Sequence, residues 1–251
     1  METSFLDTVP ETLQLSRVDK FMSSGIEVLI FAHHCFDAVS HIFLKAAERY
    51  GVNLYTTATP TSEFMAQLIV SLYNALAPRT MLHGVLMEIC GEGVLITGES
   101  GVGKSECALE LIKRGHLLVA DDVVDIARVG HKLRGESPEI VRDFMELRGI
   151  GIVDIKLIFG IGAILRKKTI DMVVHLEFWT PGKDYDRLGA KDNTMEILGV
   201  QVPLINVPVR SGRNLALIVE IAARNWRLKA EGYNAVSELD RRLEKLYGGK
   251  A

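Results

Sequence analysis

The sequence predicts an α/β protein in which a mixed β-sheet core follows a small α/β domain and precedes C-terminal helices. The chain has 251 residues, of which 48% are hydrophobic and 24% are charged, enough for one substantial core and a small second domain. Strand and helix patterns alternate before residue 78, whereas strand patterns dominate after it. A glycine-rich loop also joins one of the later strands to a helix.

The first domain is expected over residues 1–77. Its four patterned segments are a strand at 25–32, a helix at 41–51, a strand at 52–58 and a helix at 61–77. We expect Thr61 or Ser62 to cap the second helix, which ends before Pro78 and is predicted to be buried because Phe64 to Ala77 carries no charge. That run is too short to cross a bilayer, which needs about 20 apolar residues. Residues 1–20 give little signal.

The second domain is expected over residues 78–251. Strand patterns occupy 81–91, 93–98, 116–121, 124–129, 131–135, 169–179 and 203–209, and helix patterns occupy 105–115, 214–231 and 236–249. Polar and apolar residues alternate along 169–179, which predicts a half-buried strand. In the last helix, Val236, Leu239, Leu243 and Leu246 form one apolar stripe, with Ser237 near the cap. This stripe is expected to pack on the core or on a neighbouring subunit.

Charge and composition disfavour several classes of protein. Lysine and arginine total 29 against 32 acidic residues, a net charge of -3, so we expect neither nucleic acid nor a membrane surface as a partner. The N-terminal residues METSFLDTVPETLQL lack the apolar stretch of a secretory signal, which makes the cytoplasm the expected compartment. The cysteines Cys35, Cys90 and Cys107 show no C-x-x-C spacing, so a disulfide scaffold or a zinc site is not expected. Adjacent ligands on a strand point to opposite faces, so His33-His34-Cys35 also favours a structural role.

The glycine-rich loop carries the most specific motif of the chain. Gly98-Glu99-Ser100-Gly101-Val102-Gly103-Lys104-Ser105 fits G-x-x-x-x-G-K-[ST] at every fixed position. An apolar strand enters the loop, and an amphipathic helix leaves it, with Leu109 and Ile112 facing inward and Gly115 as C-cap. Backbone N–H groups of such a loop bind phosphate oxygens, Lys104 reaches the terminal phosphates and the Ser105 hydroxyl can ligate Mg²⁺. The alternative is an ordinary glycine-rich turn between a strand and a helix.

Two adjacent carboxylates follow the next apolar strand. Asp121 and Asp122 come directly after Leu117 to Ala120, at the strand end where α/β sheets bind ligands. One carboxylate could hold Mg²⁺, while its neighbour, pointing to the other side, could accept a proton from an attacking hydroxyl. The alternative is a solvated turn at the end of a strand. After a phosphate-binding loop, the pair favours a kinase over a simple nucleotide clamp.

With these motifs the sequence resembles the HPr kinase/phosphorylase family, bacterial enzymes that phosphorylate and dephosphorylate a serine of the phosphocarrier protein HPr. The resemblance runs from about Ala77 to Lys229 through APRTMLHGVL, GESGVGKSECALELIKRGHLLVADD, MELRGIGIVDI, YDRLG and PVRSGRNLA, in the family's order. It implies a P-loop fold like that of phosphoenolpyruvate carboxykinase, ATP and Mg²⁺ as cofactors, and a hexamer. Only residues 25–77 resemble the family's N-terminal domain, which implies a shortened N-terminal domain here.

The resemblance implies roles for individual residues. It makes His83, Lys104, Asp122 and Arg187 catalytic, and it places Mg²⁺ at Ser105, Asp121 and Glu146. Arg148, Gly149 and Gly151 fall in the family signature from Met145 to Asp154. Without the family, His83 reads as a structural histidine, Glu146 and Arg148 as an exposed ion pair, and Arg187 as a turn residue.

A second segment implies the reverse reaction. Pro208, Val209, Arg210, Ser211, Gly212 and Arg213 resemble the family's dephosphorylation loop, with Ser211 where a second proline is expected. There Arg210 and Arg213 could bind inorganic phosphate near the helix that starts at Asn214. Phosphate would attack phosphoserine to give pyrophosphate, with Asp122 as the acid and base of both directions. A kinase acting on another protein or a small molecule, and a nonenzymatic nucleotide-binding regulator, remain the alternatives. The intact Lys104, Asp122 and Glu146 argue against the regulator.

Overall fold

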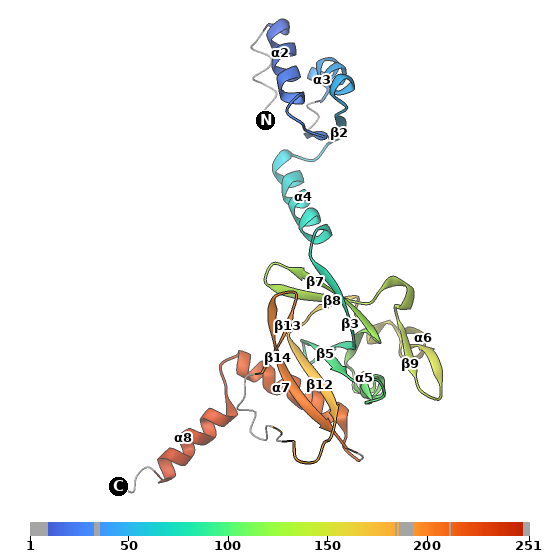
Figure 1. The fold of residues 1–251 in the computed structure, drawn as a ribbon, viewed down its shortest axis with the longest axis vertical. Coiled ribbons are helices and arrows are strands. Elements are labelled where there is room, and N and C mark those ends of the chain that lie inside the picture. Colours follow the sequence, from blue (N-terminus) through green and yellow to red (C-terminus); the bar gives the residue numbers. More distant parts are fainter. Residues whose placement is uncertain (1–9, 33–35, 184, 186–192, 211, 248–251) are drawn as a thin grey trace. The chain divides into compact units, whose positions relative to one another are not determined.

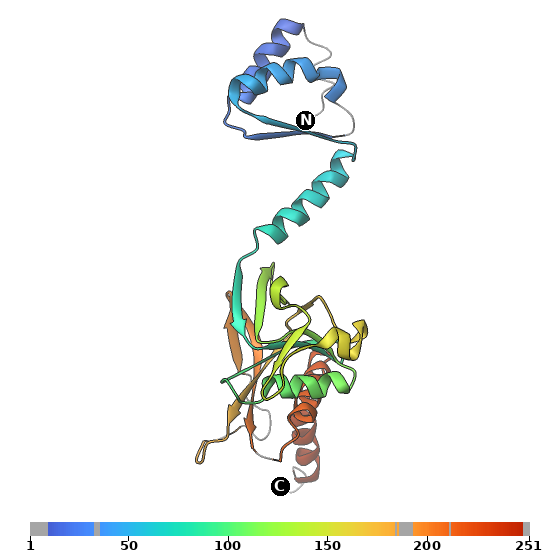
Figure 2. The same ribbon diagram turned by 90° about the vertical axis from the view of Figure 1, so that its right-hand side faces the viewer.

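The computed structural model describes residues 10–32, 36–183, 185, 193–210 and 212–247. It divides into two compact units, Met1–Leu76 and Ala77–Ala251, each of which is described by itself (Figures 1 and 2). None of the helices in the described ranges combines the length and the apolar character needed to span a membrane.

The first unit is built on two parallel strands. Its elements are α2 (Glu11–Met22), β1 (Val28–Ala32), α3 (Phe36–Tyr50), β2 (Asn53–Thr57) and α4 (Thr61–Ala75). The helix α3 is the crossover between β1 and β2, which pair in register from Val28 with Asn53. Phe31 and Phe43 pack edge to face with ring centroids 4.9 Å apart, and Val18 and Met22 of α2 are buried beside them. The weak pattern of residues 11–22 therefore belongs to a helix that covers this small core.

The predicted burial of the second helix is wrong. No residue of α4 is buried, and Ile69, Val70 and Tyr73 are each more than half exposed. A segment without charged residues can form a helix, but the helix is buried only if another part of the protein packs on it. The capping prediction is also wrong, because Pro60 occupies the N-cap position and α4 starts at Thr61 without a side-chain cap.

The second unit contains most of the strands. They are β3 (Arg79–His83), β4 (Val85–Ile89), β5 (Glu92–Gly98), β6 (Leu117–Ala120), β7 (Val123–Val129), β8 (Lys132–Glu136), β9 (Phe144–Leu147), β10 (Gly151–Asp154), β11 (Lys167–Thr169), β12 (Met172–Phe178), β13 (Thr194–Ile197) and β14 (Val200–Val209). Its helices are α5 (Lys104–Lys113), α6 (Ile155–Phe159), α7 (Leu215–Ala230) and α8 (Ala235–Tyr247), with short 3₁₀ turns at Glu139–Val141 and Ile161–Ala163.

These strands form a mixed sheet between two covering layers. The six-stranded order is β13-β14-β12-β5-β4-β6, in which β14, β12 and β5 are parallel and the outer pairings are antiparallel. Helices α5 and α7 pack on one face through the larger core cluster, and the sheet β11-β8-β7-β3 packs on the other (Figure 1). The hairpin of β9 and β10 lies beside α5. A mixed α/β sheet is thus confirmed as the architecture of this unit.

Burial on both faces corrects the prediction for residues 169–179. Met172, Val173, Val174 and Leu176 have no exposed surface, because β12 lies between β5 and β14 with a layer on each side. His175 and Glu177 remain partly accessible, and Phe178 at the end of the strand is exposed. The His175 ring lies 3.0 Å from the Thr97 hydroxyl. The strand is therefore central rather than half-buried.

Two helix ends show how local chemistry sets boundaries. Asn214 caps α7 by accepting a hydrogen bond from the Leu217 N–H at 3.0 Å. Asn234 accepts from the Val236 and Ser237 N–H groups, so Asn234 and not Ser237 is the capping residue of α8. The side chains of Leu239, Leu243 and Leu246 are 42–73% exposed. The apolar stripe of α8 is therefore not packed on this chain's core.

Candidate active site

The loop from Gly98 to Ser105 adopts a conformation that depends on glycine. Gly98, Gly101 and Gly103 have φ values of 142°, 83° and 101°, in the range that L side chains rarely adopt. A Cβ on Gly98 would lie 2.2 Å from the Leu176 carbonyl oxygen, so a side chain there would separate β5 from β12. The loop leads directly into α5, whose first turn leaves its backbone N–H groups available to an anion.

Lys104 folds back over this loop. Its ammonium group donates to the carbonyl oxygens of Gly98 at 2.9 Å and Glu99 at 3.0 Å. These bonds hold a positive charge above the N-terminus of α5. The loop therefore combines a fixed cation, a helix N-terminus and glycine backbone at one place, which suits a bound phosphate chain.

Asp121 is a buried carboxylate held at the end of β6. One of its oxygens accepts from the Ser105 hydroxyl at 2.9 Å, and the other accepts from the Glu146 N–H at 3.1 Å. The residue is 4% exposed, and burial raises the pKa of this carboxyl above its ordinary value, although both hydrogen bonds oppose the shift. Three separated segments, the start of α5, the end of β6 and β9, therefore meet at this carboxylate.

Asp122 has the opposite environment. Its φ is 65°, and the Val123 N–H donates to the Asp121 carbonyl at 2.8 Å, which makes Asp122 the centre of a γ-turn. The Asp122 carbonyl accepts from the Gly84 N–H at 3.0 Å. This turn directs the carboxylate outward, where Oδ1 lies 3.7 Å from Nδ1 of His83 and the two side chains are 70% and 83% exposed. A strained backbone thus presents one carboxylate to solvent next to the buried one.

The β9–β10 hairpin completes this side of the site. Glu146 lies on β9, and the turn that follows uses Gly149 and Gly151 at φ values of 80° and 102°. Arg148 donates to the Ser100 hydroxyl at 3.1 Å and is not paired with Glu146 in the described residues. One pocket joins the hairpin, the loop and the paired acids, and its lining consists of Val85, Ser100, Gly101, Gly103, Lys104, Ser105, Glu106, Asp121, Asp122, Glu146 and Arg148.

The segment from Pro208 to Arg213 lies at the end of β14. The Arg210 guanidinium stacks over the Trp179 ring at 3.6 Å from its centroid, and Arg213 donates to the Pro208 carbonyl at 3.3 Å. Arg213 also lines a second hollow together with Gly103 and Glu106, so this segment lies near the start of α5. Arg187 and Ser211 lie outside the described residues.

Three positions of the site had no role predicted from the sequence. Glu106 lines both hollows, Trp179 holds Arg210, and Gly84 supports Asp122. A Cβ on Gly84 would lie 2.7 Å from the Ile96 carbonyl oxygen. The signals in the sequence are the position of Glu106 directly after the loop and that of Gly84 inside the strand pattern of residues 81–91.

Comparisons with known proteins agree on one family. The profile described as "HPr Serine kinase C-terminal domain" matches residues 74–243, and that described as "HPr Serine kinase N terminus" matches residues 1–72. The second match begins earlier than the motifs at residue 25 indicated. A protein of Caldicellulosiruptor bescii named "HPr kinase/phosphorylase" is 47% identical over 97% of this chain and 78% of its own length. A protein of Caldanaerobacter subterraneus with the same name is 45% identical over 99% of this chain and 81% of its own length.

A solved structure supports the same relationship. The chain is similar to "Structure of the Hpr(Ser) kinase/phosphatase from Coxiella burnetii", with 39% identity, a TM-score of 0.57, and coverage of 64% of this chain and 98% of that chain. With two matching profiles and curated relatives over nearly the whole chain, the chain belongs to the HPr kinase/phosphorylase family.

Proposed function

We propose that this chain transfers the γ-phosphoryl group of ATP to a serine of HPr and removes it again by phosphorolysis, which releases pyrophosphate. The observation that carries the proposal is the pair of carboxylates beside the Gly98–Ser105 loop, in which Asp121 is buried and Asp122 is exposed. Their different environments suit different tasks, one in binding and one in proton transfer. The names of the relatives support HPr as the acceptor.

The glycine loop and Lys104 are proposed to hold the phosphates of ATP. Among the described residues, the Lys104 ammonium group donates to the carbonyl oxygens of Gly98 and Glu99 in the loop. Phosphate oxygens carry more negative charge and can replace these partners, while the N–H groups of the loop and of α5 donate to them. This is the P-loop arrangement that we propose for the nucleotide.

Ser105, Asp121 and Glu146 are proposed to hold Mg²⁺. The fit rests on their chemistry, since all three offer oxygen atoms and line one pocket. Burial of Asp121 raises the pKa of its carboxyl, and a cation beside it would stabilise the ionised form. A bound Mg²⁺ ion would neutralise charge on the phosphates. Ser105 and the Glu146 N–H keep the Asp121 oxygens oriented for this purpose.

Asp122 is proposed as the proton acceptor of the forward reaction. As the serine oxygen of HPr forms a bond to the γ-phosphorus, the bond from that phosphorus to the bridging oxygen breaks, ADP leaves and the serine proton moves to Asp122. In reverse, an oxygen of inorganic phosphate attacks the phosphoserine phosphorus, and protonated Asp122 returns the proton to the leaving serine oxygen. His83 lies 3.7 Å from Asp122 and is proposed to orient its carboxylate.

Arginines are proposed to stabilise the transferring group. Arg148, which lines the pocket, and Arg187 suit this role because a guanidinium is always charged and can bond two phosphate oxygens. Arg210 and Arg213, near the start of α5, are proposed to bind the inorganic phosphate consumed in the reverse reaction.

A homohexamer is proposed as the working assembly. The apolar side chains of α4 and the stripe of Leu239, Leu243 and Leu246 on α8 are exposed in the single chain, and subunit contacts would cover them. Light scattering of the purified protein tests this proposal. A mass of six chains supports it, and a monomer at micromolar concentration refutes it.

The function is tested with γ-labelled ATP, Mg²⁺ and HPr from the same organism. We expect label on HPr, followed by its release as pyrophosphate when inorganic phosphate is added. Absence of label on HPr, with ATP binding intact, would refute HPr as the acceptor and favour a kinase with another substrate. Replacing the acceptor serine of HPr by alanine is the control for specific transfer.

A further inference from the structure

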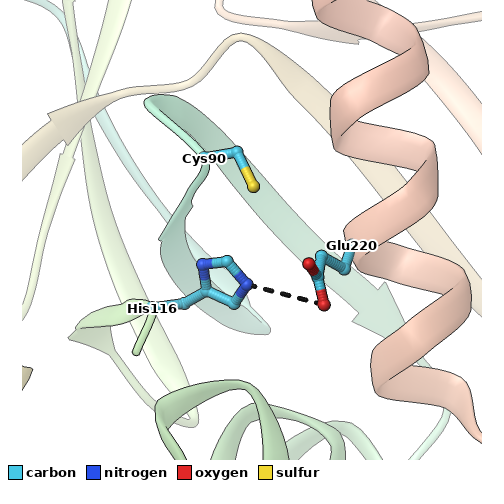
Figure 3. A group of neighbouring side chains, drawn as sticks. All are labelled: Cys90, His116 and Glu220. Carbon is cyan, nitrogen blue, oxygen red and sulfur yellow. Dashed lines mark ion pairs between the residues drawn. The ribbon is translucent and has the colours of Figure 1, made fainter. Parts of the chain in front are cut away.

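Three side chains from distant parts of the second unit converge away from the candidate active site. Cys90 lies in the turn between β4 and β5, His116 follows α5, and Glu220 lies on α7 (Figure 3). Their sulfur, nitrogen and oxygen atoms all lie within 4.8 Å of one another. We propose that Cys90, His116 and Glu220 bind a divalent transition-metal ion of the zinc class.

His116 provides the first argument for a ligand. Its side chain is only 10% exposed, and its Nε2 atom is buried without a hydrogen-bond partner among the described residues. Nε2 points toward Glu220, whose Oε2 is 3.8 Å away, too far for a hydrogen bond (Figure 3). Buried ring nitrogens normally have a hydrogen-bond partner. His116 Nε2 has none among the described residues, and a metal ion would supply one.

Glu220 is oriented as a metal-binding carboxylate. Its Oε1 accepts two hydrogen bonds from Arg224, at 2.9 and 3.2 Å, whereas Oε2 faces His116. The hydrogen bonds from Arg224 also lower the pKa of Glu220. Arg114 also reaches Oε2, at 3.4 Å, but it has a second partner in Glu110 at 3.3 Å. A metal ion can therefore take Oε2 while both arginines keep a carboxylate partner.

Cys90 is held in an unusual backbone conformation. It has a φ of 55° and forms, with Gly91 at 92°, the two-residue turn between the paired residues Ile89 and Glu92. Glycine, asparagine and aspartate are the residues favoured in such turns, so a cysteine here is strained. Burial raises the pKa of its thiol. The strained turn fixes the sulfur next to His116.

The donor set selects the class of metal. Sulfur, imidazole nitrogen and one carboxylate oxygen suit Zn²⁺ or Co²⁺, whereas Mg²⁺ prefers oxygen alone. Donors of a tetrahedral zinc site lie roughly 3.2–3.8 Å apart, so side-chain rotations of about 1 Å close the cluster. A water molecule would complete a four-coordinate site. The site is separate from the proposed Mg²⁺ site, because α5 places Lys104 and His116 at opposite ends of a helix about 15 Å long.

The test is a Co²⁺ titration of the full chain after removal of metals with a chelator. We expect one equivalent of Co²⁺ to give a sulfur-to-cobalt charge-transfer band, which Zn²⁺ abolishes by displacement and excess Mg²⁺ does not. Cobalt bound at an oxygen-only site gives no such band, so this result does not depend on the proposed function. Absence of the band in the wild-type protein would overturn the proposal.

Variants identify the ligands. Cys90→Ser, His116→Gln and Glu220→Gln are each expected to weaken Zn²⁺ binding by more than about 100-fold. Cys107→Ala, at the buried cysteine outside the cluster, and Cys35→Ala are the matched controls and should keep the band. Retained thermal unfolding and ATP binding verify that each variant is folded. Unchanged Zn²⁺ affinity in any of the three ligand variants, or loss of the band only in a control, would refute the assignment.

Discussion

Replacing Gly84 by alanine tests how the backbone positions Asp122. The new Cβ would lie 2.7 Å from the Ile96 carbonyl oxygen, closer than Cβ atoms approach in real proteins, and Ile96 pairs with Val85 at the start of β4. Relief requires a backbone shift that costs about 1–3 kcal/mol, of which the lower entropy of the unfolded chain offsets about 0.4–1 kcal/mol. The middle of these ranges leaves a net loss of about 1.3 kcal/mol, which for a domain of this size lowers the melting temperature by about 4 °C, and by up to about 10 °C at the upper end.

The same shift displaces the active-site groups. The Gly84 N–H holds the Asp122 carbonyl, and His83 precedes it, so we expect phosphoryl transfer to fall by about 100-fold for a displacement of about 1 Å. ATP binding should change little, because the Gly98–Ser105 loop is not touched. Thermal unfolding and single-turnover transfer to HPr measure the two effects.

A matched control exists in the same unit. A Cβ added to Gly162 would meet no atom within 4 Å, and the φ of Gly162 is not positive. Gly162→Ala should therefore leave both stability and transfer unchanged or slightly raise stability. A Gly84→Ala variant with the melting temperature and transfer rate of the Gly162→Ala variant would refute the reasoning.

Three further predictions follow from the charges of the site. Burial raises the pKa of Asp121 in the folded protein, so the wild-type protein should lose stability relative to Asp121→Asn as pH rises from about 4 through the raised native pKa. Mg²⁺ should raise the melting temperature of the wild type but not that of Asp121→Asn. Parallel pH profiles of unfolding for the two proteins would contradict the first expectation. Arg210→Ala should slow phosphorolysis by about tenfold or more but phosphorylation by less than about threefold. In a Trp226→Phe background, inorganic phosphate should alter the fluorescence of Trp179, on which Arg210 stacks. An equal loss of rate in both directions would refute a phosphate-binding role for Arg210. Lys104→Ala should weaken both ATP binding, measured by calorimetry, and transfer; normal binding would remove Lys104 from the phosphate site.

Local patterns predicted the parts of the fold that local chemistry determines. The strand, loop and helix around Lys104 follow from glycine positions and apolar spacing, and Asp121 was expected near Ser105 because strand ends and loop share one sheet edge. By contrast, residues 81–91 read as one strand, although Gly84 divides them between two sheets. Apolar character continues across that glycine, so periodicity does not reveal the break.

Other features depend on contacts between distant segments. The bond from Arg148 to Ser100, the stacking of Arg210 on Trp179 and the convergence of Cys90 with His116 all join residues far apart in sequence. No spacing rule detects them. In the same way, an apolar run predicts burial only if another surface covers it, and the described chain offers none to α4.

The most direct test of the mechanism compares Asp122→Asn with the wild type in both directions. If one carboxylate accepts the serine proton and returns it, the variant should lose phosphorylation of HPr and phosphorolysis of phosphoserine-HPr together, each by at least about 100-fold, while ATP binding stays within about threefold. Asp240→Asn, an exposed carboxylate on α8, is the control and should change neither. Unchanged transfer in either direction by Asp122→Asn would contradict a single acid and base for the two reactions.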